Sequence, residues 1–260
     1  MEDKDSQSRV KVMLNKVPEI TLFFWVIKIL CTTVGETGAD FLDTKLNLGL
    51  DGVTLIIGTM LVVTLIFQFK TKKYVPGIYW LAVVLISIVG TLITDNLTDR
   101  LGIPLMITTI IFTISLSIVF AIWYKKEKTL SIHTIITTRR EAFYWLAILF
   151  TFALGTAAGD LLAEKINLGY LLSAIIFGVL IASVAISHFV FKVNAVLAFW
   201  IAYILTRPPG ASIGDYLSQD VDNGGLGLGT VITSMIFLAT ILATVIYLTV
   251  TKKDVIIKQT

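Results

Sequence analysis

Four aspartates at one position of a repeated pattern are the residues best suited to chemistry in this chain. In each copy a tryptophan is followed by a glycine ten residues later and by an aspartate five residues after that, at Trp25/Gly35/Asp40, Trp80/Gly90/Asp95, Trp145/Gly155/Asp160 and Trp200/Gly210/Asp215. Carboxylate oxygens bind protons and hard divalent cations such as Mg²⁺, Ca²⁺ and Mn²⁺. A carboxylate delivered four times to an equivalent place predicts a shared polar site.

Glu36 adds a fifth carboxylate, four residues before Asp40. On a helix this spacing places both side chains on one face, where a proton or a cation between them would relieve their repulsion. We therefore predict a metal site whose ligands are Glu36, Asp40, Asp95, Asp160 and Asp215. The alternative is that each aspartate ends its helix as a solvated or capping residue. The constant spacing favours the shared site, because a merely solvated residue is free to drift by a turn between copies.

Two basic residues lie inside apolar stretches. An unpaired charge there costs at least about 2.5–3.5 kcal/mol on insertion scales. Lys28 and Arg207 are therefore expected to pair with the acids, in a structural salt bridge from Arg207 to one of the aspartates or in a functional gate. The side chains predicted to complete a polar pathway are Thr33, Thr91, Thr156, Asn47 and Asn167. The Pro208-Pro209 pair is expected to break its helix, since proline lacks the backbone donor.

The elements that must position these residues are apolar. The hydrophobic fraction of the chain is 56%, above the roughly 45–50% of soluble domains. Most of the apolar stretches approach or exceed the ~20 residues that a helix needs to cross a bilayer, and they cover residues 18–34, 48–69, 76–94, 101–124, 142–158, 168–191, 195–213 and 226–250. They lack the period-two alternation of barrel strands. The sequence predicts an all-α membrane protein of eight transmembrane helices, two in each repeat.

Basic residues predict the orientation of the helices. Of the 21 Lys and Arg residues, 16 precede the first span or follow an even-numbered span, three lie on the opposite side, and two lie within spans. The positive-inside rule then places both termini in the cytoplasm. Four parallel helical hairpins about an axis normal to the membrane follow, with the odd-numbered helices innermost because they carry the glycines and aspartates.

The expected organisation is an N-terminal cytoplasmic segment, four repeats and a C-terminal tail, at residues 1–17, 18–75, 76–141, 142–194, 195–251 and 252–260. The tryptophans are interpreted as interfacial anchors or packing residues. The glycines are expected to permit close helix approach or local unwinding. Repeats one and three share Asn-Leu-Gly after the aspartate, so the symmetry is expected to be nearer twofold than fourfold.

Several function classes find no support in the sequence. It contains no phosphate-binding glycine loop followed by Lys-Ser/Thr and no paired Cys or His motif with metal spacing. The net charge of +3 comes from predicted cytoplasmic anchors and does not indicate nucleic-acid binding. No nucleophile and base pairing is apparent, so we do not expect an enzyme or a tightly bound cofactor. The expected partners are the lipid bilayer and an inorganic cation or proton, with oligomerisation left open.

The tandem two-span units with their tryptophans, together with Lys16–Thr21, Gly35–Thr37 and Asn167–Tyr170, resemble a bacterial membrane-protein family defined by a repeat of unknown function. This resemblance implies the fold and a bacterial origin, but no activity. The expected location is the bacterial inner membrane. Glu36–Asp40 is also similar to the Glu-x-Gly-Asp motif of manganese and calcium cation/proton exchangers, with Ala39 inserted.

These observations lead to two main functional hypotheses. The first is a secondary transporter or exporter of a divalent cation, most plausibly Mn²⁺, coupled to protons through Glu36 and the aspartates. The second is a non-transporting scaffold or sensor, whose aspartates form a structural network with Lys28 and Arg207. An intramembrane enzyme ranks third. A water-accessible cavity reaching the carboxylates would separate the first hypothesis from the second.

Overall fold

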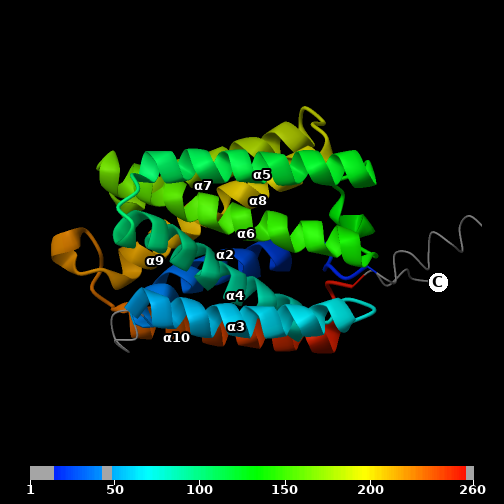
Figure 1. The fold of residues 1–260 in the computed structure, drawn as a ribbon, viewed down its shortest axis with the longest axis horizontal. Helices are drawn as coiled ribbons and strands as arrows, with labels where there is room; N and C mark the ends of the chain where they lie inside the picture. The colour runs from blue at the N-terminus through cyan, green and yellow to red at the C-terminus, as the bar shows by residue number, and fades with distance from the viewer. Residues whose placement is uncertain (1–14, 43–48, 256–260) are drawn as a thin grey trace, which may run out of the picture.

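The computed structural model describes residues 15–42 and 49–255, whose regular structure is entirely helical (Figure 1). The α-helices are α2 (Leu22–Asp40), α3 (Gly49–Lys70), α4 (Pro76–Asp95), α5 (Leu105–Glu127), α6 (Thr138–Asp160), α7 (Tyr170–Phe189), α8 (Ala195–Leu205), α9 (Arg207–Ser218) and α10 (Thr230–Thr251). Short π-helical turns, η2 (Asn96–Arg100) and η4 (Leu161–Lys165), extend α4 and α6. Two 3-10 turns, η3 (Ile132–Thr134) and η5 (Val221–Asn223), lie in connections.

Eight helical spans in the described residues are long and apolar enough to cross a membrane. Helices suit this role because each backbone donor and acceptor is satisfied within its own segment. The seventh span consists of α8 and α9, which are separated at Thr206. Pro208 and Pro209 occupy the first turn of α9, where proline is tolerated because those N–H groups have no helical partner. The predicted break in this helix is confirmed.

The spans form an inner and an outer set, as predicted. Over their most apolar windows the odd-numbered spans are 61–78% buried, whereas the even-numbered spans are only 11–28% buried. The inner set is therefore α2, α4, α6 and the α8–α9 pair. The outer helices α3, α5, α7 and α10 expose apolar side chains such as Leu55, Ile110 and Ile232, which suits contact with lipid.

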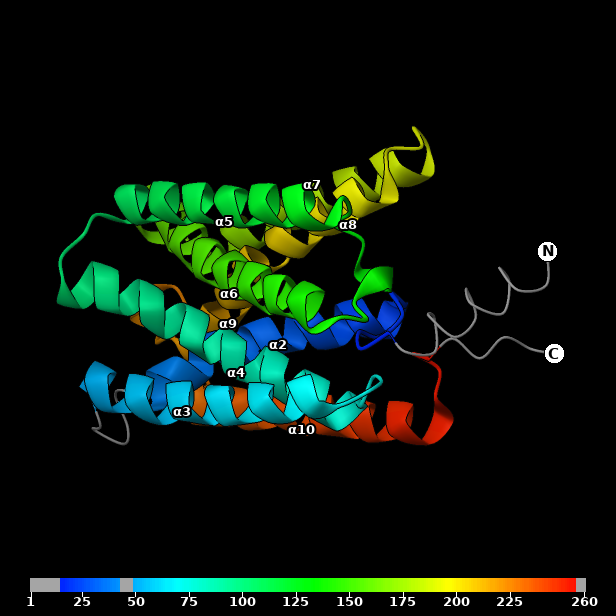
Figure 2. The ribbon, with the colours of Figure 1, turned by 45° about the vertical axis from the view of Figure 1, so that its right-hand side comes forward.

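The inner helices form a closed ring. Helix α2 packs on α4, α4 on α6, α6 on α9, and α9 returns to α2. Each outer helix packs against the first helix of the next repeat: α3 on α4, α5 on α6, α7 on α8 and α9, and α10 on α2. Both ribbon views show α3 beside α10 on one side of the ring and α5 on the other (Figures 1 and 2). The four hairpins thus interlock in chain order, and the last closes on the first.

The repeated glycines make the contacts that close this ring. A Cβ on Gly35 would lie 1.8 Å from Ser87 Oγ, and a Cβ on Gly210 would lie 1.6 Å from Thr32 Oγ1. The other two glycines behave alike, with Gly90 against Phe152 and Gly155 against Arg207. Each glycine therefore faces the residue seven positions after the tryptophan of the following repeat. All four helices remain helical through these positions, so the glycines serve close approach and not unwinding.

This packing corrects the expectation of nearly twofold symmetry. The same glycine contact occurs at all four junctions between repeats, so the backbone arrangement is pseudo-fourfold. The likeness of repeats one and three is confined to their side chains. A glycine at the same phase of each inner helix lets the neighbouring helix approach closely at every junction.

Both ends of the described chain lie at one end of the bundle, where Glu19 N donates to Asp254 O at 3.0 Å. We call this the termini end, and the opposite end, where α2, α4 and α6 finish, the carboxylate end. The tryptophans lie toward the termini end and act in packing. Trp80 Nε1 donates to Tyr74 OH at 3.1 Å and Trp200 Nε1 to Leu130 O at 2.9 Å. Which end faces the cytoplasm stays a prediction.

Candidate cation site

The four repeated aspartates end or nearly end the inner helices. Asp40, Asp95 and Asp160 are the last residues of α2, α4 and α6, and Asp215 lies in α9 three residues before its end. After each of the first three, the backbone continues as a π-helical turn, at residues 41–42, in η2 and in η4. Such turns are rare in proteins, and many of those that occur lie at functional sites. In this chain they mark the same position in three repeats.

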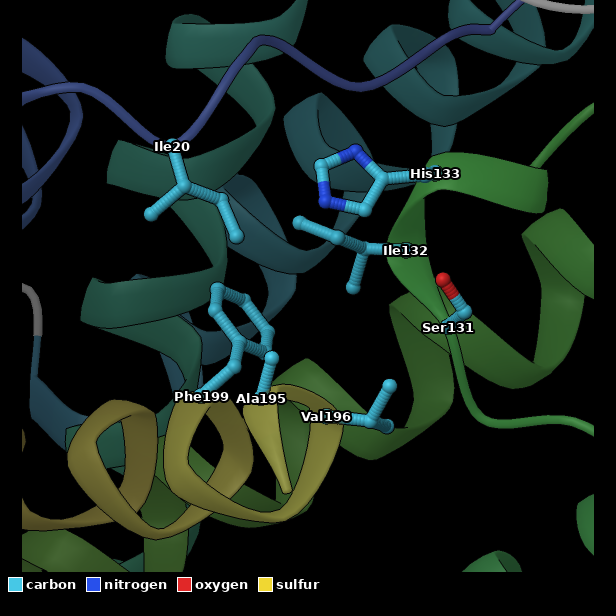
Figure 3. Close-up of a pocket in the computed structure, with 7 residues that line it drawn as sticks. All are labelled: Ile20, Ser131, Ile132, His133, Ala195, Val196 and Phe199. Carbon is cyan, nitrogen blue, oxygen red and sulfur yellow. The ribbon is translucent and has the colours of Figure 1, made fainter. Parts of the chain in front are cut away.

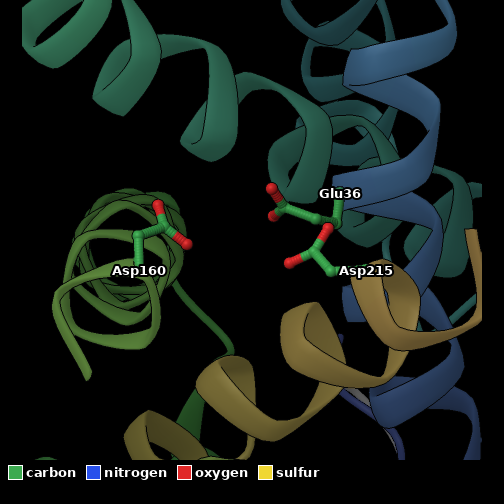
Figure 4. Close-up of side chains that lie close together, drawn as sticks. All are labelled: Glu36, Asp160 and Asp215. Atoms are coloured by element: carbon green, nitrogen blue, oxygen red, sulfur yellow. The ribbon is translucent and has the colours of Figure 1, made fainter. Parts of the chain in front are cut away.

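The carboxylates converge at this end of the ring. One oxygen each from Glu36, Asp160 and Asp215 lies within 4.8 Å of the other two, and Figure 4 shows these groups pointing toward a common space from α2, α6 and α9. Asp95 has Glu36 and Asp40 among its electrostatic neighbours. Glu36 and Asp215 are buried, and Asp160 is partly buried. The ring thus brings together three of the five acids that the sequence selected, and the place of Asp40 and Asp95 in the predicted metal site stays a prediction.

Arg207 inserts its guanidinium group among the inner helices. The residue is fully buried at the start of α9, with its stem against Gly155. Nη2 donates to Glu36 Oε2 at 3.0 Å and to Thr156 Oγ1 at 2.8 Å, and it also contacts Thr91 Oγ1. Nη1 donates to the carbonyl oxygen of Thr32 at 2.7 Å. The acceptors belong to α2, α4 and α6.

Three of these partners are equivalent in the repeats. Glu36, Thr91 and Thr156 each lie eleven residues after the tryptophan of their own repeat. Because a single Nη2 atom reaches all three, the guanidinium group lies close to the pseudo-fourfold axis. The sequence suggested an aspartate as the partner of Arg207; the ion pair in the structure is with Glu36. Only this residue of the three equivalents carries a charge that can neutralise Arg207.

Lys28 lies one helical turn from Cys31 on the inner face of α2 and is also buried. Its Nζ donates to Tyr203 O at 2.9 Å and to Thr206 Oγ1. It also lies 4.1 Å from the centre of the Tyr203 ring and 5.2 Å from that of Phe152. Among the described residues it forms no ion pair, so the expected pairing of Lys28 with the acids is wrong. Aromatic faces and the polar groups at the α8–α9 break stabilise its charge instead.

The other predicted pathway residues divide into three groups. Thr91 and Thr156 bind Arg207, as described above. Thr33 donates from Oγ1 to Gly210 O at 3.0 Å and so ties α2 to α9. Asn167 is exposed, with a φ of +61°, in the turn before α7, and does not join the buried polar contacts. Asn47 lies outside the described residues.

Tyr203 and Thr206 were missed by sequence reasoning. Tyr203 occupies the position of Lys28 in the fourth repeat, three residues after the tryptophan. Aligning the repeats around a closed ring would have placed it on the helix next to that lysine. Thr206 carries a weaker signal, since only the neighbouring proline pair marks it as the point where the helix breaks.

The polar groups lie in order along the axis of the ring, from the carboxylate end toward the termini end. Acids occupy the carboxylate end, Arg207 follows, and Lys28 lies further toward the termini end, with Arg207 as an electrostatic neighbour. Beyond Lys28 the residues that precede the four tryptophans, namely Phe24, Tyr79, Tyr144 and Phe199, are all buried, and the hydroxyl groups of the two tyrosines are 2.5 Å apart. A cation is attracted to the acids and repelled beyond them. This arrangement can bind a cation while obstructing its passage.

Comparison with known proteins places the repeats in one family. Four segments, residues 23–74, 78–129, 143–194 and 198–254, match the family described as Repeat of Unknown Function (DUF347). No curated protein and no solved structure matches the chain.

Proposed function

The chain belongs to the family of membrane proteins built from this repeat of unknown function, and from its own site we propose that it is a secondary transporter of a divalent metal cation, with Mn²⁺ as the first candidate. We further propose that protons couple to this transport and that the protein resides in the inner membrane of a bacterium. It is proposed to act without enzymatic chemistry and without a tightly bound cofactor.

The observation that carries this proposal is the convergence of Glu36, Asp160 and Asp215 inside a ring of membrane helices. Carboxylates at such distances repel one another in a poorly hydrated environment, and Arg207 supplies one positive charge to three acids, so the cluster favours a further cation or a proton. An all-oxygen set without cysteine or histidine suits Mg²⁺, Ca²⁺ or Mn²⁺ better than Zn²⁺ or Cu⁺. Likeness of the Glu36–Asp40 segment to manganese and calcium exchangers selects Mn²⁺ for the first test.

Arg207 is the internal counter-ion in this mechanism. In the structure its guanidinium group neutralises Glu36. An arriving divalent cation offers two charges to the same oxygens, so it competes with Arg207 for Glu36. Arg207 already contacts the carbonyl oxygen of Thr32. If Arg207 withdraws toward that oxygen when a cation binds the carboxylates, its positive charge no longer blocks the path beyond them. Transport would require this coupling, since a fixed guanidinium group would repel the cation.

The test is cation movement into liposomes that contain the purified protein and a fluorescent Mn²⁺ reporter. Glu36→Gln, Asp160→Asn and Asp215→Asn keep the shape of each side chain and remove only its charge, so each should abolish the flux. Asp222→Asn is the matched control, because Asp222 is exposed in η5, outside the cluster. Since protons compete for the same oxygens, the apparent affinity for Mn²⁺ should fall as the pH is lowered.

A second candidate function is supported by the same contacts of Arg207. A guanidinium group with four acceptors on three helices fixes the ring, as a non-transporting scaffold or sensor would require. Absence of Mn²⁺ movement by the wild-type protein, or equal flux in the three cluster variants and the Asp222→Asn control, would replace the transporter with this structural network.

A further inference from the structure

The chain segment before α2, residues 15–21, is extended and largely buried. We call it the strap. Its backbone is bonded to three different parts of the termini end: Tyr74 N donates to Asn15 O at 3.1 Å, Lys16 N to Ile135 O at 3.2 Å, and Glu19 N to Asp254 O at 3.0 Å. These partners lie between α3 and α4, between α5 and α6, and after α10. The strap therefore joins loops that belong to different hairpins.

The strap also lies beside α8, the inner helix of the fourth repeat at this end. Figure 3 shows Ile20 facing a small groove whose other walls are Ile132 and His133 of η3 and Val196 and Phe199 of α8. Phe199 is one of the four residues that precede the tryptophans. We call these four residues the aromatic layer; they lie around the axis of the ring near the termini end. The strap thus lies next to the aromatic layer.

One buried ion pair fastens the strap. Lys16 Nζ lies 2.6 Å from Glu141 Oε2 and 3.0 Å from Phe69 O, and Gln68 Nε2 donates to Glu141 Oε1 at 3.1 Å. Glu141 in the first turn of α6 is 1% exposed, and Lys16 is 7% exposed. Loss of either partner would leave the other charge buried, which is strongly destabilising for the contact. The strap is also held by its backbone hydrogen bonds to loops, by Val17, which is buried in the hydrophobic core, and by Glu19, whose carboxylate lies 3.7 Å from His133 Nδ1. Backbone hydrogen bonds between loops open more easily than helix packing.

We propose that the strap is the gate at the termini end of the axis, and that the ion pair between Lys16 and Glu141 is its latch. The proposal rests on the proposed function, because a cation that leaves the carboxylate cluster toward this end must pass the strap. In the structure the latch is closed while the acids lie at the opposite end. Release of Lys16 from Glu141 frees the strap from α6 and opens the aromatic layer to water.

The single cysteine of the chain provides the reporter for this gate. Cys31 is fully buried on α2, and its electrostatic neighbours include Lys28. If the strap is the gate, water that reaches Cys31 from the termini end passes it. In detergent-purified protein we measure the rate at which a small cationic methanethiosulfonate reagent modifies Cys31. Lys16→Met and Glu141→Gln should each raise this rate about tenfold or more, because weakening of a buried ion pair shifts local opening by at least that factor.

Two further variants make the outcome decisive. Glu127→Gln removes a carboxylate that pairs with Arg139 and Arg140 at the same end of the bundle but does not touch the strap, so it should label at the wild-type rate. The charge exchange Lys16→Glu with Glu141→Lys should restore slow labelling. The gate proposal is overturned if Lys16→Met and Glu141→Gln both keep native tryptophan fluorescence and have Cys31 modified at the wild-type rate. It is also overturned if Glu127→Gln raises the modification rate as much as the latch variants do. The readout needs no cation movement, so failure of the transporter proposal appears separately in the liposome assay.

Discussion

Arg207 offers the sharpest test of the site, because its loss affects charge, hydrogen bonding and packing together. Replacement by Met keeps much of the stem that packs on Gly155 and removes the guanidinium group. Glu36 then lies buried without its ion-pair partner. Removing one partner of a buried pair costs about 3–5 kcal/mol. We expect Arg207→Met to lower the free energy of unfolding by an amount in this range.

Two other variants separate the contributions to this loss. Arg207→Lys keeps the charge, but three ammonium donors on a different stem cannot reproduce all four contacts of the guanidinium group. Its cost should be about 1–3 kcal/mol, from one or two lost hydrogen bonds. The double variant Glu36→Gln with Arg207→Met removes both charges of this ion pair, so neither is left without the other. Its cost should therefore be smaller than the sum of the two single costs, by roughly 1–3 kcal/mol.

The assay is reversible unfolding in mixed micelles with increasing sodium dodecyl sulfate, followed by tryptophan fluorescence. Arg100→Met is the matched control, because Arg100 forms an ion pair with Asp51 in which both side chains are more than half exposed. Such exposed pairs contribute about 0–1 kcal/mol. Equal costs for Arg207→Met and Arg100→Met would refute the reasoning, as would strict additivity of the Glu36 and Arg207 changes. Equal costs would mean that Arg207 is no more desolvated than Arg100, and strict additivity would mean that Arg207 and Glu36 are not coupled.

Two other predictions concern packing and orientation. Gly210→Ala should destabilise the protein by about 1–3 kcal/mol through overpacking against Thr32, and adding Thr32→Ala should recover part of this loss. The control is Gly178→Ala, on an exposed helix face with open space around it. It should be neutral or slightly stabilising in the same unfolding assay. For orientation, cysteines that replace Lys72 or Lys128 in a protein lacking Cys31 should react with an impermeant thiol reagent only from the cytoplasmic side, and labelling only from the outer side would reverse the predicted topology.

The extent to which the site was predictable differs among its residues. The repeated spacing selected Asp160 and Asp215, and the position four residues before Asp40 selected Glu36; these three lie close together, since a helix fixes the phase and the depth of each residue along its own axis. It also selected Thr91 and Thr156, which lie at the level of Glu36 in their repeats. Spacing along one helix carries no information about its rotation relative to neighbouring helices. Asn167 was therefore assigned to the pathway, although it is exposed in a turn.

The sequence by itself determined the eight apolar spans, the four hairpins, the broken seventh helix and the burial of the odd-numbered helices. These follow from the length of hydrocarbon to be crossed, from the missing proline donors and from the positions of small residues, which are local properties of each segment. Only the tertiary structure decided that the ring is pseudo-fourfold, that Arg207 pairs with Glu36 and that Lys28 rests on aromatic rings. Those outcomes depend on which helix faces which, because a long basic side chain can reach several acceptors and the packing of the ring selects among them.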